Sequence, residues 1–207
     1  MNIHKLVEDI KDDRIIKETE VRTKIVYPLL KLLNYKPNYI TDEFPIYGKE
    51  GRNDLPTKHV DIMIFAKQNA NNHTSRKNVD IDWVRNNSLI AIELKKPSEN
   101  ISTAKEQATF YAMWARSLIY IITNGKDIEI YQLNDFTADS LLFSGKVLEL
   151  EQSWQSINNI LYFPNLRARK IKPVLKSTDT TIYSEVWEDV SFDIERDITD
   201  AIKGNKL

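Results

Sequence analysis

The 207-residue sequence contains no cysteine, so disulfide bonds, thiolate zinc sites and cysteine nucleophiles are all excluded. It also lacks any run of about 18 apolar residues, the length that a membrane-spanning helix requires. The N-terminal segment MNIHKLVEDIKDDR is amphipathic and acidic, without the cationic start and apolar core of a signal peptide. We therefore expect a cytoplasmic protein with no membrane partner.

Two further kinds of site are missing from the sequence. There is no G-x-x-x-x-G-K-[ST] phosphate-binding loop, which leaves the chain without an ATP site. His4, His59 and His73 are too scattered for a zinc site, although His59 precedes Asp61 by two residues and is either a helper there or a bystander. The formal net charge is only −1, so a nucleic-acid partner would have to meet a local basic surface.

The N-terminal half of the chain changes from helical to strand-like periodicity. Apolar residues at helical spacing predict helices over residues 3–10 and 21–33, with Pro28 expected to kink or restart the second. From Tyr39 the sequence predicts three strands, in NYITDEFPIYG, KHVDIMIFA and SLIAIELKK. The long polar segment 67–87 between the last two is expected to be a mobile or functional loop.

After the third strand the sequence predicts one helix and two further strands. Thr103 and Glu106 have the spacing of a capping box, so a helix is expected to begin there. Asn124-Gly125 predicts a tight turn between two strands. This order predicts an α/β fold with a mixed sheet of about five strands flanked by helices. We expect residues 1–150 to form the core and residues 151–207 a helical C-terminal appendage.

Charged side chains near the ends of two predicted strands suggest a metal site. If the second and third strands pair with Phe65 opposite Leu89 and Met63 opposite Ala91, then Asp61 faces Glu93. Two carboxylates that close repel each other unless a cation or a shared proton lies between them, and Mg²⁺ suits such oxygen ligands. Strand alternation puts Lys95 on the same face as Glu93.

Each motif is weak by itself. A lone Asp in a strand is usually solvated, and Glu-x-Lys in a strand is usually an ion pair without chemistry. Gln107 and Tyr111 lie four residues apart on one face of the next helix, a spacing that is mostly used for packing. Their order along the chain carries the hypothesis: an acid, then Glu-x-Lys, then Gln-x-x-x-Tyr.

In that order the chain resembles the PD-(D/E)xK nuclease superfamily, and specifically the N-terminal nuclease domain of the restriction (R) subunits of type I restriction-modification systems. The segment TEVRTKIVYPLLKLLNY is similar to the opening helix of that family, and IITNGKDIEIYQL to its T-N-G hairpin. The resemblance covers roughly residues 15–135. It implies a restriction-endonuclease-like core.

The resemblance also implies roles for individual residues. Asp61 and Glu93 would be metal ligands, and Lys95 the catalytic lysine. Gln107 and Tyr111 would contact DNA or support the site. Glu20 would approach the metal from the first helix, although a surface carboxylate near a helix N-terminus would look the same.

Two features of the sequence depart from the family pattern or compete with it. No proline directly precedes Asp61, where the superfamily motif has one, but the motif is degenerate at that position. Asp80 and Asp82, in the polar segment before Glu93, could take the place of the first acid if the strand boundaries differ.

The expected function is that of a Mg²⁺-dependent endodeoxyribonuclease in a defence system against foreign DNA, with Mn²⁺ as a substitute metal. Its partners would be DNA and the motor, methyltransferase and specificity subunits of a restriction system. A non-catalytic module that binds nucleic acid or docks on other subunits is the alternative. A nuclease acting on RNA or single strands would share the same metal chemistry, and the sequence does not separate these readings.

Basic residues occur in two places that could meet phosphates. One is the run Arg167, Arg169, Lys170, Lys172 and Lys176, which could equally pair with the acidic segment 185–200. The other is the polar segment 67–87, with Arg76, Lys77, Trp83 and Arg85.

Overall fold

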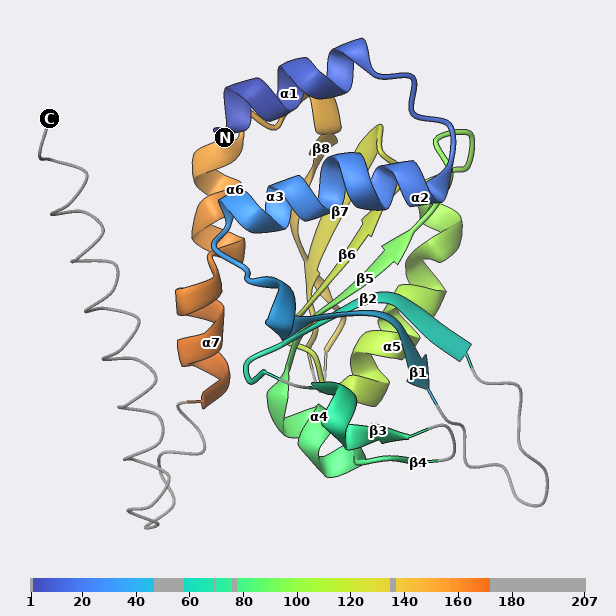
Figure 1. Cartoon of the computed structure of the whole chain (residues 1–207), viewed down its shortest axis with the longest axis vertical. Coiled ribbons are helices and arrows are strands. Elements are labelled where there is room, and N and C mark those ends of the chain that lie inside the picture. Colours follow the sequence, from blue (N-terminus) through green and yellow to red (C-terminus); the bar gives the residue numbers. More distant parts are fainter. Residues whose placement is uncertain (1, 47–57, 69, 76–77, 135–136, 172–207) are drawn as a thin grey trace, which may run out of the picture. The chain divides into compact units, whose positions relative to one another are not determined.

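The computed structural model describes residues 2–46, 58–68, 70–75, 78–134 and 137–171. Its central element is a mixed sheet of six strands in the order β1-β2-β5-β6-β7-β8 (Figure 1). The strands are β1 (Ile40–Ile46), β2 (Lys58–Phe65), β5 (Ser88–Leu94), β6 (Ile119–Thr123), β7 (Asp127–Gln132) and β8 (Ser140–Lys146). Only β5 and β6 pair in parallel within this sheet. The predicted α/β class is confirmed, with one strand more than expected.

Helices surround this sheet in the described part of the chain. The α-helices are α1 (Ile3–Asp12), α2 (Glu18–Val21), α3 (Tyr27–Leu32), α4 (Ile81–Asn87), α5 (Lys105–Ala115), α6 (Trp154–Leu161) and α7 (Phe163–Ile171). Shorter helical segments are η1 (Arg22–Val26), η2 (Pro37–Tyr39), η3 (Ala70–His73), η4 (Ile101–Ala104) and η5 (Val147–Glu149). α5 forms the crossover between the parallel strands β5 and β6, as parallel pairing requires. None of the described helices combines the length and hydropathy of a membrane span.

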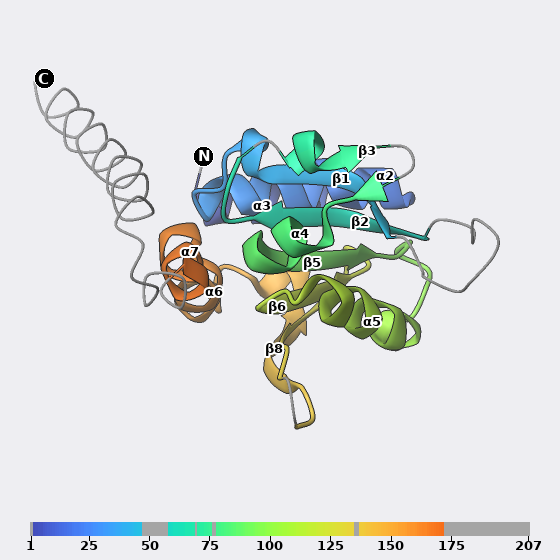
Figure 2. The ribbon, with the colours of Figure 1, turned by 90° about the horizontal axis from the view of Figure 1, so that it is seen from below.

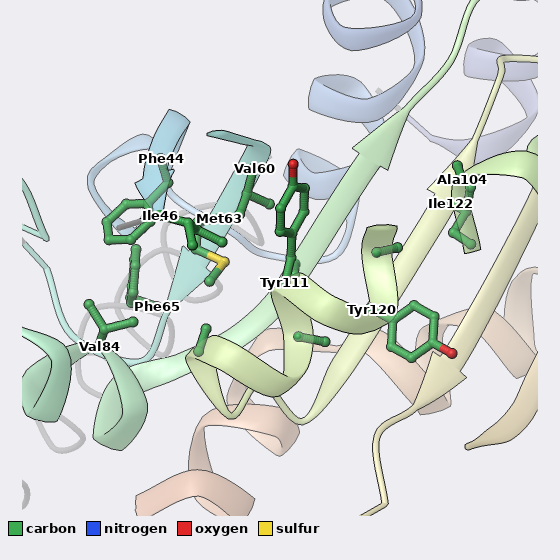
Figure 3. Packing of buried hydrophobic residues seen from close by; sticks show 14 of the residues in the cluster. Phe44, Ile46, Val60, Met63, Phe65, Val84, Ala104, Tyr111, Tyr120 and Ile122 are labelled. Carbon is green, nitrogen blue, oxygen red and sulfur yellow. The ribbon is translucent and has the colours of Figure 1, made fainter. Parts of the chain in front are cut away.

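The sheet is covered on both faces, because successive side chains of a strand point to opposite sides. On one face Met63, Ala91 and Tyr120 pack in a cluster with the small residues of α5 and with Tyr111 (Figure 3). On the other face Ile92 lies with Leu29 of α3 in an apolar lining. Figure 2 shows the N-terminal helices and α5 on opposite sides of the strands. This coverage explains why every residue of β5 is buried.

Pro28 changes the hydrogen bonding of the second helix rather than ending it. Proline has no N–H, and its ring clashes with the carbonyl four residues before it in an α-helix. The preceding segment η1 is a π-helix, in which the N–H of Tyr27 bonds to the carbonyl of Arg22, five residues back. α3 then begins with Pro28 in its first turn, where the missing donor is harmless. α2, η1 and α3 therefore form one continuous helix (Figure 1).

The helix predicted near Thr103 is confirmed as α5, but the Thr103–Glu106 capping box does not form. Asn100 caps the segment instead, because its Oδ1 accepts a hydrogen bond of 2.9 Å from the N–H of Ser102. Thr103 lies inside the first turn, where its hydroxyl donates back to the carbonyl of Asn100 at 2.7 Å. The turn η4 leads directly into α5 at Lys105. An asparagine is as strong a cap as threonine, and here it comes first along the chain.

The predicted Asn-Gly turn is confirmed between β6 and β7. Asn124 Oδ1 accepts from the N–H groups of Lys126 and Asp127, and Gly125 has a φ of +82°. A Cβ atom at Gly125 would lie 3.0 Å from Val21, so this turn also has little room for a side chain. The following strand β8 was not predicted, since most of its residues are exposed and show no apolar alternation.

The polar segment between β2 and β5 contains secondary structure where the structure describes it. It contains a two-residue hairpin of β3 (Thr74–Ser75) and β4 (Asn78–Val79), followed by α4. Trp83 of α4 lies 5.1 Å from the ring of Phe65 and stacks on His73 at 4.2 Å. The sequence of this segment is mostly polar and has no long apolar periodicity, so these aromatic contacts could not be predicted from it.

The C-terminal helices α6 and α7 belong to the first compact unit, which extends from Met1 to Lys170. Tyr35 donates a hydrogen bond of 2.6 Å to the carbonyl of Leu161, and Phe163 packs against the rings of Tyr35 and Tyr39. The expected division at residue 150 stays a prediction. The acidic segment 185–200 lies outside the described residues.

Candidate active site

The predicted acids lie close together where the pairing of β2 with β5 ends. Met63 is opposite Ala91, as predicted, and the pairing ends with Ile62 opposite Ile92, the residues next to Asp61 and Glu93. Phe65 pairs with Ser88 rather than with Leu89, because the register shifts between residues 64 and 65. This irregularity lies at the far end of the pairing from the acids. It therefore leaves their predicted alignment intact.

Asp61 is held where the pairing of β2 with β5 ends. Its Oδ2 accepts a hydrogen bond of 2.6 Å from the N–H of Leu94, and its Oδ1 lies 3.6 Å from Nη2 of Arg22. The side chain is 15% exposed. Burial raises the pKa of Asp61 to about 6, against the hydrogen bond from Leu94, which lowers it.

Glu93 and Lys95 form an ion pair on one face of β5, as strand alternation predicted. Nζ of Lys95 donates to Oε1 of Glu93 at 2.8 Å, and the glutamate side chain is only 3% exposed. Burial raises the pKa of Glu93 to about 7, and the charge of Asp61 adds to this rise. The pKa of Lys95 is itself raised: burial acts to lower it, but the hydrogen bond and charge of Glu93 outweigh burial.

The second oxygen of Glu93 is the clearest sign of a ligand site. Oε2 is buried and has no hydrogen-bond partner. A buried carboxylate oxygen left unpaired is unfavourable by about 1–3 kcal/mol or more, so natural structures rarely contain one. A divalent cation between Asp61 and Glu93 would satisfy this oxygen.

The donor set fits magnesium better than a metal that needs a closed protein cage. No cluster of three or more His, Cys, Asp or Glu suited to a metal occurs among the described residues. Mg²⁺ is commonly bound by one or two carboxylates, with water and phosphate oxygens completing its octahedron. Asp61 and Glu93 meet that requirement, and the absence of thiolates and clustered histidines disfavours zinc.

Gln107 and Tyr111 contact each other on α5, next to the acids. Nε2 of Gln107 donates to the Tyr111 hydroxyl at 2.8 Å. Burial raises the pKa of Tyr111 and the hydrogen bond lowers it, while the negative charges of Glu93 and Asp61 raise it further. The ring of Tyr111 rises from α5 beside Val60 and Met63 (Figure 3). This pair is therefore within the electrostatic reach of the carboxylates.

The structure does not bring Glu20 to the acids. Its carboxylate accepts from the N–H groups of Ile16 and Lys17, at 2.8 and 2.9 Å, and so caps its own helix. These two hydrogen bonds lower the pKa of Glu20. Glu18 is the helix carboxylate whose charge acts on the site, because it raises the pKa values of both Asp61 and Glu93. The sequence offered one signal for Glu18: it lies one helical turn before Arg22.

The competing candidates lie elsewhere. Asp80 caps α4 by accepting from the N–H of Trp83 at 3.0 Å, and Asp82 lies in the first turn of the same helix. His59 is exposed and pairs with Pro45 in the β1–β2 ladder. Asp61 therefore stays the predicted first acid.

The basic residues that the structure describes mostly serve packing. Arg167 is buried, and its Nε donates to the carbonyl of Ala66 at 3.0 Å. Lys170 donates to the carbonyl of Arg116 at 2.6 Å, at the end of α5. Arg85 donates to the carbonyl of Trp114 at 3.2 Å. Arg76, Lys77, Lys172 and Lys176 lie outside the described residues.

Comparison with known proteins agrees with the resemblance seen in the sequence. Residues 17–141, more than half of the chain, match the family model described as "Type I restriction enzyme R protein N terminus (HSDR_N)". The chain belongs to this family. The R-protein match spans Asp61, Glu93 and Lys95 as well as both residues of the Q-x-x-x-Y motif.

Among solved structures, the chain is similar to the fragment structure of a putative HsdR subunit of a type I restriction enzyme from Vibrio vulnificus YJ016. The sequences are 15% identical and the TM-score is 0.44. The match covers 71% of this chain and 26% of the Vibrio chain, so this chain spans about a quarter of the length of the Vibrio chain. No curated protein matches the chain at a significant level of sequence similarity.

Proposed function

We propose that the chain is a magnesium-dependent endodeoxyribonuclease that hydrolyses phosphodiester bonds of DNA within a type I restriction system. The observation that carries the proposal is the unpartnered, buried Oε2 of Glu93 beside Asp61 and Lys95. Two neighbouring carboxylates with raised pKa values, of which Glu93 is buried and Asp61 is 15% exposed, are unfavourable without a cation. They occur where the R-protein resemblance expects metal ligands. Membership of the R-protein family supports a place in a restriction system.

Asp61 and Glu93 would hold the cation, which when bound lowers the pKa of a water molecule and polarises a phosphoryl oxygen. Lys95 would act on the phosphate from the same face. Its raised pKa keeps the ammonium protonated, so that it can donate to a phosphate oxygen or orient the attacking water. Gln107 would line the approach to the site and keep the Tyr111 hydroxyl in place.

The proposed partners follow from this chemistry. DNA is the substrate, and its cleavage would take place in the cytoplasm as defence against foreign DNA. The chain has no ATP-binding motif, so motor, methyltransferase and specificity functions would come from other parts of the restriction system. Mn²⁺, which also prefers oxygen ligands, is expected to replace Mg²⁺.

The decisive experiment measures nicking of supercoiled plasmid DNA with and without Mg²⁺. Asp61→Ala, Glu93→Ala and Lys95→Ala should each reduce cleavage by at least about a hundredfold, because each removes a group that acts on the transferred phosphate. Lys146→Ala is the matched control, since Lys146 pairs with Asp127 on the β7–β8 edge outside the site. Circular dichroism should show that all four variants are folded.

Two results would reject the proposal. If the three site variants cut DNA as well as the parent, the site is misassigned. If the parent binds DNA equally with and without Mg²⁺ and never nicks it, the chain is a non-catalytic binding module of the same family. Parallel assays on duplex DNA, single-stranded DNA and RNA identify the substrate.

A further inference from the structure

Arg22 connects the candidate site to the first strand of the sheet. Its Nη2 forms an ion pair with Oε1 of Glu43 and lies 3.6 Å from Oδ1 of Asp61. The arginine side chain is only 14% exposed, and its Nε is buried without a partner. Asp61 is thus held from two sides, by Arg22 at Oδ1 and by the N–H of Leu94 at Oδ2.

Glu43 reaches Arg22 through an unusual backbone conformation. In the β1–β2 ladder Asp42 pairs with Ile62 and Phe44 with Val60, while Glu43, the residue between them, makes no pair. Its φ is +48°, in the left-handed region that a non-glycine residue seldom adopts within a strand. Such strain persists where surrounding structure holds it, often at functional sites. Here it accompanies the ion pair with Arg22.

Arg22 also lies in a segment with irregular backbone hydrogen bonding. Arg22 is the first residue of η1, the π-helix before Pro28. Interruptions of this kind are frequent at functional sites, because the extra residue changes the direction of the preceding side chains. Glu18 and Arg22, one turn apart, both act on the charge of Asp61 from this part of the helix.

We propose that Arg22 is a positioning residue that keeps the carboxylate of Asp61 aimed at the divalent cation, and that Glu43 in turn holds Arg22. The inference rests on the proposed function, since it concerns the same metal site. Arg22 would act through Asp61 and not on the DNA. The opposite arrangement is a counter-ion that competes with the metal for Asp61, and it predicts the opposite change in metal affinity.

The test measures the affinity of the full chain for Mn²⁺ without DNA, with electron paramagnetic resonance to detect the bound ion. Arg22→Gln should weaken binding about tenfold, and Glu43→Gln should weaken it less. The double variant should bind no more weakly than Arg22→Gln, because both changes break one chain of contacts. Arg22→Lys should recover only part of the affinity, since an ammonium lacks the planar fork of the guanidinium.

Lys24→Gln is the matched control. Lys24 is a basic residue of the same π-helix whose Nζ lies 3.3 Å from Asp13, so its loss should leave Mn²⁺ binding unchanged. Tighter or equal binding by Arg22→Gln overturns the inference. If that variant is unfolded in a thermal scan, Glu43→Gln decides, because Glu43 is exposed and its substitution should not unfold the protein. Unchanged Mn²⁺ binding by Glu43→Gln then rejects the inference. Failure of the parent to bind Mn²⁺ rejects the proposed function itself.

Discussion

The strands β2 and β5 contain two adjacent regions of opposite character. In the middle of the region where they pair, residues 62–65 and 88–92 are at most 1% exposed, and all of them except Leu89 have a partner on the other strand. Next to these residues Asp61 and Glu93 introduce charge, and the buried Oε2 of Glu93 is left without a hydrogen-bond partner. The paired apolar region is packed within the protein, whereas the charged end formed by Asp61 and Glu93 leaves a carboxylate oxygen without a hydrogen-bond partner.

This difference assigns separate roles to the two regions. Apolar burial in the middle supplies stability, because each fully buried aliphatic side chain contributes about 1.5–3 kcal/mol. The charges at the end reduce stability in the absence of a cation, since burial disfavours their ionised forms. The rigid middle is what keeps the charged end in place. Variants should therefore separate stability from metal binding.

The largest effect on stability is expected in the middle region. Ile64→Ala truncates a fully buried side chain in the sheet and should lower the free energy of unfolding by about 2–5 kcal/mol. The folded fraction should still bind Mn²⁺ with the parent affinity. Urea denaturation measures the first quantity and metal titration below the transition measures the second.

Leu141→Ala is the control for this prediction. Leu141 is 52% exposed on the edge strand β8, so its truncation should change stability by no more than about 0.5 kcal/mol. If the two substitutions destabilise the protein equally, the middle of the sheet is not where its stability lies.

Glu93→Gln should have the reverse effect at the charged end. The pKa of Glu93 is about 7 in the folded protein, against an ordinary value near 4.5, so the folded state binds this proton more tightly than the unfolded state. The contribution of Glu93 to the free energy of unfolding is fully present below about pH 4.5 and is lost as the pH rises through 7. At pH 8 without metal, the glutamine variant should be about 1–3 kcal/mol more stable than the parent. Thermal unfolding between pH 4.5 and 8 checks this, and the gain should vanish at the acid end.

The exposed Glu106 on α5 provides the comparison for that measurement. Glu106→Gln should change the free energy of unfolding by no more than about 0.5 kcal/mol, because this side chain is exposed. Addition of Mg²⁺ should stabilise the parent and leave Glu93→Gln unaffected. A parent that is more stable than Glu93→Gln at pH 8 without metal would show that the buried charge is already compensated.

The sequence predicts the middle of the strands and the Glu93-x-Lys95 pair well, because both follow from short-range periodicity. Apolar runs mark the strands, and alternation alone places Glu93 and Lys95 on one face. The alignment of Asp61 with Glu93 also follows from pairing two apolar runs. It survives the shift at Phe65, since that shift affects only the opposite end.

The features that sequence does not predict depend on the surroundings of a residue. Glu18 and Glu20 are both glutamates of the first turn of α2. Only the backbone conformation of the preceding residues decides which one caps the helix. Arg22 and Glu43 meet through a π-helix and a left-handed residue in a strand, neither of which has a periodic signature. The exposed strand β8 lacks an apolar pattern because it has few core contacts to make.

Tyr111 belongs to both regions, and its contact with Gln107 gives the smallest predicted effect. The ring packs in the apolar cluster, while the hydroxyl lies in the field of the carboxylates and accepts a hydrogen bond of 2.8 Å from Gln107. Gln107→Ala should therefore lower stability by only about 1 kcal/mol, because one partly exposed hydrogen bond is lost. It should also raise the pKa of Tyr111 further, since that bond lowers it. Tyr111→Phe combined with Gln107→Ala should show little additional loss, and additive losses would mean that the two side chains act separately.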